Sequence, residues 1–192
     1  MRLIAGGKTL AEKFNVVMDP RVKTPMADLE AQFNVSKAIY DDALKATSAL
    51  HEITVLRDQM RAKPTPAPAG GDSLESKLTK IAGGRGEGGA RGGGGRGGPV
   101  GPPNLTTLRL QLARMEVALQ SADAAPTTAQ VEAYDRIKQP LADLIQQWDQ
   151  LKATDLKTLN EVRRKRGLPL YILDTYFLDH NVEDQIEVGD DN

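Results

Sequence analysis

The chain has 192 residues, of which 40% are hydrophobic and only 4% aromatic, and this composition suits exposed helices that pack along narrow seams better than one large core. Its formal net charge of −1 excludes a general attraction to nucleic acid or to anionic lipid, and no apolar run of about 20 residues predicts a membrane span. The absence of cysteine and the presence of two histidines exclude disulfides and thiolate metal sites and argue against a histidine metal cluster.

Residues 1–22 predict a β-hairpin. Arg2–Ile4 and the stretch from Lys8 to Met18 have strand character, and Gly6-Gly7 between them supplies the positive φ of a tight turn. Asp19-Pro20 then ends the second strand. Because a two-stranded hairpin is marginal in water, we interpret it as the remnant of a β-sandwich whose other strands lie outside this chain.

Residues 24–167 predict an antiparallel helical bundle of three to four helices, so the expected fold class is mainly α. Apolar residues three or four apart predict helices at 25–62, 73–82, 104–122 and 128–166. The clearest seam consists of leucines and one methionine: Leu105, Leu108, Leu112, Met115 and Leu119. Short connections between such helices favour antiparallel neighbours.

Several residues predict how the helices of this bundle begin, bend and end. Asn104 is expected to cap the third helix, and Thr127 with Gln130 forms a capping-box pattern for the fourth. In the fourth helix, Pro140 predicts a kink and Thr154-Asp155 predicts a new helix start. Gly167 and Pro169 are expected to end it.

Two stretches within the bundle and one tail are expected to lack regular structure. Residues 63–72 contain three prolines, and residues 83–103 contain 12 of the 18 glycines with almost no apolar side chain, so both are predicted to be disordered. Residues 168–192 carry seven acidic residues and no lysine or arginine, which predicts an acidic tail. Some residues of the tail are apolar enough to dock, as a short strand, on a surface that the sequence does not identify: Tyr171, Ile172, Tyr176, Phe177 and Leu178.

Three sets of residues together resemble a known arrangement: Arg2–Lys8 continuing into Val17–Val22, the helix start at Asp28-Leu29, and Asp123–Thr128 followed by Trp148 and Ala153–Leu156. They are similar to the C-terminal region of bacterial BNR-repeat "glycosyl hydrolase" proteins with sortilin-like β-propellers. The resemblance implies propellers, an immunoglobulin-like sandwich and a helical tail with a glycine-rich loop, in an exported parent protein. Sugar chemistry would then lie in propellers outside this chain, and the segment after Pro169 departs from the family's ending.

No catalytic, cofactor-binding or metal-binding residue is predicted. The adjacent acids Asp41-Asp42, Glu183-Asp184 and Asp190-Asp191 are interpreted as solvated surface groups, because neighbouring helical residues point apart. The serines lack a nucleophile-elbow motif, and His51 is interpreted as a partly exposed helical side chain. Tyr134 and Trp148 share one helix face, where aromatics are usually core, and are expected to face the Leu105–Leu119 seam.

Two groups of basic residues are candidate nucleic-acid contacts. Arg91 and Arg96 each begin an Arg-Gly-Gly triplet, which can contact phosphates and stack on bases, although a flexible linker explains the same composition. The run of Arg163, Arg164, Lys165 and Arg166 is interpreted mainly as cations that stabilise a helix C-terminus through the macrodipole. Weak RNA binding therefore remains an alternative, and nucleic acid is not the expected partner.

The sequence thus predicts a non-catalytic structural or interaction module with no cofactor, at the C-terminus of a larger propeller-containing protein. The expected partners are other domains of the parent protein or a second copy in a homo-oligomer, and no membrane partner is expected. The alternative is a fragment of a secreted glycoside hydrolase whose active site lies outside this chain. The chain carries no signal-peptide pattern, and its residues do not predict a localisation.

Overall fold

The computed structural model describes residues 2–64, 73–84 and 101–173. The elements in chain order are β1 (Arg2–Ala5), β2 (Lys8–Ala11), α1 (Met26–Ala62), α2 (Leu74–Ala82), α3 (Leu105–Leu119), α4 (Thr128–Leu151), the π-helix η1 (Lys152–Leu156) and α5 (Lys157–Lys165). The chain is therefore mainly α-helical, as the sequence predicts. Most of the two stretches predicted to be disordered, and the acidic tail from residue 174 on, lie outside the described residues.

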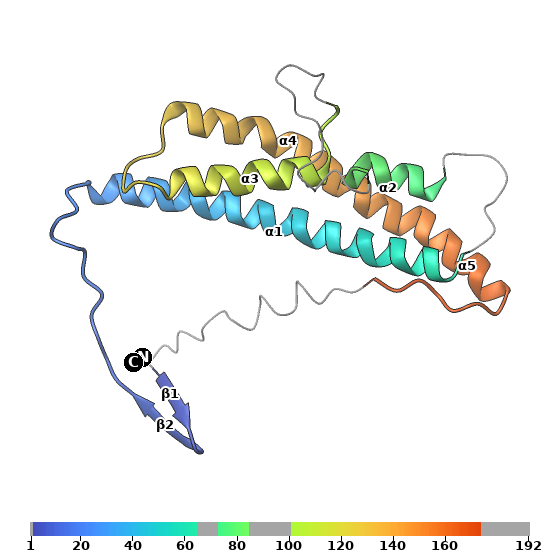
Figure 1. The fold of residues 1–192 in the computed structure, drawn as a ribbon, viewed down its shortest axis with the longest axis horizontal. Helices are drawn as coiled ribbons and strands as arrows, with labels where there is room; N and C mark the ends of the chain where they lie inside the picture. Colours follow the sequence, from blue (N-terminus) through green and yellow to red (C-terminus); the bar gives the residue numbers. More distant parts are fainter. Residues whose placement is uncertain (1, 65–72, 85–100, 174–192) are drawn as a thin grey trace.

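The helices form three rods that lie side by side (Figure 1). The first rod is α1, whose 37 residues give it a length of about 55 Å. In the second rod α2 and α3 run back along α1, and in the third rod α4, η1 and α5 follow one another without a break. Consecutive rods are antiparallel, as predicted, and the third rod consequently runs parallel to the first.

The predicted helix caps are confirmed. Asn104 accepts a hydrogen bond from the Thr107 amide at 3.0 Å, and the Thr107 side chain returns to the Asn104 backbone. Thr127 and Gln130 form the same reciprocal pair at the start of α4. Each pair satisfies amide donors that the first helical turn leaves without a partner, which contributes about 1 kcal/mol.

The core is one continuous cluster between the rods. In α3, Leu105, Leu108, Leu112 and Leu119 are at most 4% exposed, which confirms the predicted seam. Their partners in the same cluster include Ile39, Ile53 and Leu56 of α1 and Ile137, Leu141 and Leu144 of α4. Complete burial of one such side chain contributes about 1.5–3 kcal/mol, so this cluster is the main source of stability.

The third rod differs from the sequence prediction at Thr154. The predicted helix start there is wrong, because the rod continues through η1 and the Thr154 hydroxyl donates to the Gln150 carbonyl four residues earlier. Leu151 and Leu156 are both buried although they are five residues apart. A π-helical turn keeps such a pair on one face, whereas an α-helix would rotate one of them away from the core.

The N-terminal hairpin is shorter than predicted. β1 and β2 pair from Arg2 opposite Ala11 to Ala5 opposite Lys8, and Gly6 and Gly7 have φ of +57° and +74° in the turn between them. The second strand ends at Ala11 rather than at Met18, at the residue that pairs with Arg2. Residues 12–25 instead form an arm that leads to α1, and the hairpin stands away from the bundle (Figure 1).

Helix α2 is held to both long rods by charged groups. The buried Arg57 of α1 donates to Thr79 at 3.1 Å, and its Nε lies 3.0 Å from Glu75 in an ion pair without hydrogen-bond alignment. On the other side, Lys77 donates to Asp155 of η1. That hydrogen bond is the main cause that lowers the pKa of Asp155, against a smaller opposing effect of burial.

We expect the Lys77–Asp155 pair to make stability depend on acid pH. A lowered carboxyl pKa contributes stability that is present above the unfolded value, about 3.9, and is lost as the pH falls through the folded value. The pair is partly solvent-exposed, so Asp155→Asn should cost about 0.5 kcal/mol at pH 7 and abolish that share of the acid loss. Urea unfolding at pH 7 and at about pH 2.5 measures both effects, and Asp143→Asn, on the exposed face of α4, is the control. Identical pH profiles for wild type and Asp155→Asn would contradict this expectation.

Candidate functional site

Glu52 of α1 is a buried acid in the middle of the bundle, which the sequence pattern did not indicate. Glu52 of α1 is 7% exposed, and its Oε2 accepts hydrogen bonds from Trp148 Nε1 at 2.7 Å and from Lys152 Nζ at 3.1 Å. Burial lowers the pKa of Lys152, but its hydrogen bonds to Asp149 and Glu52 outweigh this effect and raise the pKa. The Lys152 ammonium also lies 5.4 Å from the Trp148 ring centroid. The cluster is satisfied internally, so its role is to join α1 to the third rod.

A second contact joins the same two rods nearer the N-terminal end of α1. Tyr134 of α4 is buried, and its hydroxyl donates to Asp42 of α1 at 2.8 Å. Burial and then this hydrogen bond raise the pKa of Tyr134 well above its ordinary value, so the phenol stays protonated at neutral pH. The interpretation of Asp42 as a solvated group is therefore wrong, whereas the Asp41 side chain is 45% exposed and pairs with Lys37. The burial of Tyr134 and Trp148 confirms that they are core, with their polar atoms bonded to α1.

Of the acidic pairs considered for catalysis, Asp41-Asp42 is described, and Glu183-Asp184 and Asp190-Asp191 lie outside the described residues. Asp42, Lys45, Lys138 and Asp149 line an open hollow of about 320 Å³ between α1 and α4, but each acid there is already bonded to a tyrosine or a lysine. His51 is half-buried on α1. Within residues 2–64, 73–84 and 101–173, no three His, Asp or Glu side chains are grouped so that they could hold a metal ion. None of the helices in these ranges is long and apolar enough to cross a membrane.

The basic run at the end of α5 divides into one buried and three exposed residues. Arg163 is 1% exposed and donates to the Pro169 carbonyl at 2.6 Å and to the Lys63 carbonyl at 2.9 Å, so the prediction that it is a candidate nucleic-acid contact is wrong. Arg164, Lys165 and Arg166 remain exposed, next to the C-terminal carbonyls of α5. The other candidates, Arg91 and Arg96, lie outside the described residues.

The segment after α5 docks on the end of α1. Gly167, with φ of +67°, ends the helix as predicted, and the chain returns in extended form along Gln59 and Lys63. Tyr171 is 4% exposed, and its ring centroid lies 4.0 Å from the Arg163 guanidinium carbon. Tyr171 and Ile172 thus dock at the junction of α1 and α5, although they do not form a strand there. Tyr176, Phe177 and Leu178, which were expected to dock with them, lie outside the described residues.

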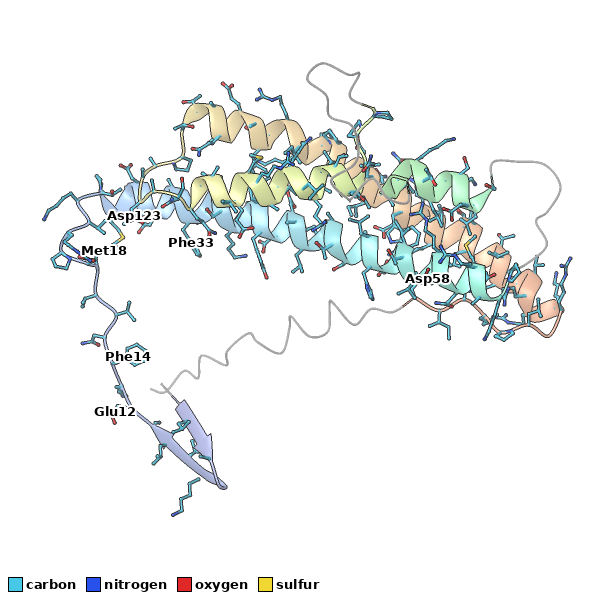
Figure 2. All side chains as sticks on the ribbon, viewed as in Figure 1. Glu12, Phe14, Met18, Phe33, Asp58 and Asp123 are labelled. Carbon is cyan, nitrogen blue, oxygen red and sulfur yellow. The ribbon has the colours of Figure 1, made fainter. Side chains whose placement is uncertain are left out.

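The N-terminal hairpin and arm form the largest group of uncovered apolar side chains in the described part of the chain. Leu3 and Leu10 are opposite each other in the hairpin and are 59% and 66% exposed. In the arm, Phe14, Val16, Val17 and Met18 are 50–87% exposed, and Phe14 lies on the part of the arm that is away from the bundle (Figure 2). We call residues 2–18, which comprise the hairpin and the first part of the arm, the hairpin arm. Its apolar surface is the feature of this structure that most directly indicates a partner.

We expect the buried carboxylate of Glu52 to be essential for stability. Glu52→Ala removes the acceptor of the Trp148 indole and one partner of Lys152, and unpaired buried polar groups cost about 1–3 kcal/mol each. The free energy of unfolding should therefore fall by about 2–4 kcal/mol in urea titrations. Glu30→Ala, at an exposed position of the same helix, should change it by less than about 0.5 kcal/mol. Equal effects of the two substitutions would refute this assignment.

Adjacent arginines provide a second matched pair. Arg163→Ala should lower the free energy of unfolding by about 2–4 kcal/mol, because it leaves the Lys63 and Pro169 carbonyls without this donor and uncovers Tyr171. Arg164→Ala, one residue further and exposed, should have an effect below about 0.5 kcal/mol. Thermal or urea unfolding measures both values. A larger effect of Arg164→Ala would show that the exposed cations, and not the buried one, stabilise this end of the bundle.

Comparison with known proteins assigns no family to this arrangement. No family model, no curated protein and no solved structure matches the chain.

Proposed function

We propose that this chain is a non-catalytic helical module that attaches through its hairpin arm to a β-sheet domain of a larger protein. The observation that supports the proposal most directly is the exposed apolar surface of residues 2–18, which stands away from the bundle (Figure 1). Proteins rarely leave a contiguous apolar surface uncovered unless a partner covers it. The bundle then acts as a spacer or as a docking surface beside that domain.

The backbone of the hairpin favours a β-sheet as the partner. β1 and β2 are four residues each and pair only with one another in the described chain, so both outer edges have donors and acceptors available for a further strand. Such a hairpin gains stability from additional strands or from cover on its apolar face. Leu3 and Leu10 share one face, so a sheet that extended past them would place both leucines in its core.

The resemblance to the C-terminal region of BNR-repeat proteins supports the same partner, since it implies an immunoglobulin-like sandwich immediately before the helices. It also supports the interpretation that any glycosidase activity belongs to propellers elsewhere in the parent. Within the bundle, Asp42, Glu52 and Arg163 are committed to contacts between helices, which supports a structural role. RNA binding has less support than this function, because its described candidate contacts are only three exposed residues, Arg164, Lys165 and Arg166.

Amide hydrogen exchange tests the proposal. In the isolated chain, the amides of β1 and β2 should exchange within seconds, because a lone hairpin opens with a free energy near zero, while the amides of α3 stay protected. In a longer chain that includes the residues encoded immediately upstream, the hairpin amides should become protected by at least about 100-fold. The α3 amides, which should not change, are the internal control.

Two results would contradict the proposal. Slow exchange of the hairpin amides in the isolated monomer would show that the hairpin needs no partner sheet. Robust turnover of chromogenic glycosides by the isolated chain would overturn its non-catalytic part.

A further inference from the structure

The segment Leu170–Leu173 is held by its backbone in an unusual way for a chain that follows a helix. Asn160 of α5 donates to the Tyr171 carbonyl at 2.9 Å and accepts from the Tyr171 amide at 2.8 Å. Gln59 of α1 does the same for the next residue, donating to the Ile172 carbonyl and accepting from its amide at 2.9 Å. Two side-chain carboxamides on different rods thus replace the two strands that would flank this segment in a sheet.

Backbone contacts of this kind do not depend on which side chains the extended segment carries. A peptide strand offers one donor and one acceptor per residue, and a carboxamide matches both at once. Peptide-binding domains that add a strand to a sheet obtain affinity from such backbone bonds and specificity from pockets for alternate side chains. Asn160 and Gln59 therefore supply the general part of a peptide-binding site.

One side chain supplies the specific part. The Tyr171 hydroxyl donates to the Lys63 carbonyl at 2.7 Å and accepts from Arg163 at 2.8 Å, while the guanidinium covers the ring. Phenylalanine at this position would fill the space but lose both hydrogen bonds of the hydroxyl, and Arg163 would then keep its bonds to the Lys63 and Pro169 carbonyls only. The neighbouring side chains are not enclosed, since Leu170 is 38% and Ile172 is 71% exposed. Exposed and buried side chains thus alternate along the segment, as in an extended peptide that is recognised through one buried side chain.

The site also has room beside its present occupant. A groove of about 420 Å³ runs between the end of α1 and the docked segment, lined by Val55, Gln59, Ala62 and Leu170 among others. The segment is attached through an exposed turn at Gly167 and Leu168. The segment is therefore joined to the bundle at one end only, through a turn outside the groove. A ligand on a tether would be joined in the same way.

We propose that the junction of α1 and α5 is a recognition site for an extended peptide with a tyrosine anchor between apolar residues, which residues 168–173 of this chain fill in cis. Arg163 and the Lys63 carbonyl select the tyrosine, and Asn160 and Gln59 hold the backbone. This site lies at the opposite end of α1 from the hairpin arm and does not depend on the function proposed for that arm.

Removal of the resident tyrosine anchor tests the proposal directly, because the segment that stays attached keeps only its backbone bonds and competes weakly. The full chain with Tyr171→Ala loses the resident anchor, and a fluorescent N-acetylated peptide of residues 168–173 should bind it with a Kd on the order of 10–100 µM. The same peptide with alanine in place of tyrosine should bind about 30-fold more weakly, and the wild-type chain should bind the tyrosine peptide at least about 10-fold more weakly because its site is filled. Anisotropy titration measures all three affinities.

Absence of saturable binding to a folded Tyr171→Ala chain up to about 1 mM peptide would overturn the proposal, and so would equal binding to the variant and the wild type. Circular dichroism establishes that the variant is folded. The expected contrast between the two peptides separates anchor recognition from general adhesion to the apolar surfaces of the chain.

A second experiment keeps every native contact, in case Tyr171→Ala fails to fold. A protease site inserted between Gly167 and Leu168 is cleaved after folding, so that residues 168–192 become a separate peptide. That fragment should remain bound and should be displaced by the tyrosine peptide at concentrations about 30-fold lower than by the alanine peptide. Equal displacement by the two peptides, or release of the fragment on cleavage without measurable rebinding, would refute the site.

Discussion

A buried carboxylate sets the relative position of the two longest rods. Glu52 cannot be removed from water at low cost unless donors meet it, and Trp148 and Lys152 meet it from one face of the third rod. Because both donors lie four residues apart on that rod, a shift of either rod by one helical turn would leave the acid or the indole unpaired. Leucines tolerate such a shift far better, since they pack without directional bonds. The apolar seam thus stabilises the bundle, and Glu52 selects one register for it.

The contacts on either side of Glu52 agree with that register. Asp42 meets Tyr134 nearer the start of α1, and the Lys63 carbonyl meets Arg163 at its end, so the polar contacts follow the parallel course of the two rods. At the N-terminal end of α1, Gln32 donates to the carbonyls of Leu119 and Ala122 and holds the turn between α3 and α4. These side chains use the polar groups of the bundle for assembly.

The sequence predicted what is determined locally and missed what depends on distant partners. Helix bounds, the Leu105–Leu119 seam and the caps at Asn104 and Thr127 follow from spacing and from residues within one turn, and the structure confirms them. Asp42 was interpreted as solvated because adjacent helical residues point apart, and Arg163 was interpreted as a terminal cation because its basic run lies at the end of a helix. Their partners are more than 90 residues away, at Tyr134 and at Lys63, and no local pattern identifies them. The π-helical turn had a visible signal, the five-residue spacing of Leu151 and Leu156.

The two extended segments of the chain show why exposure alone does not define a binding surface. The hairpin arm and residues 168–173 are both short and rich in aliphatic and aromatic side chains. In the C-terminal segment, carboxamides from two helices satisfy consecutive peptide groups and an arginine encloses the tyrosine, so desolvation of that backbone is offset by bonds that the bundle itself provides. In the hairpin arm the leucines, Phe14 and the valines remain uncovered. The partner that we propose for the hairpin arm would therefore bring both apolar cover and backbone bonds, which a sheet with a free edge supplies together.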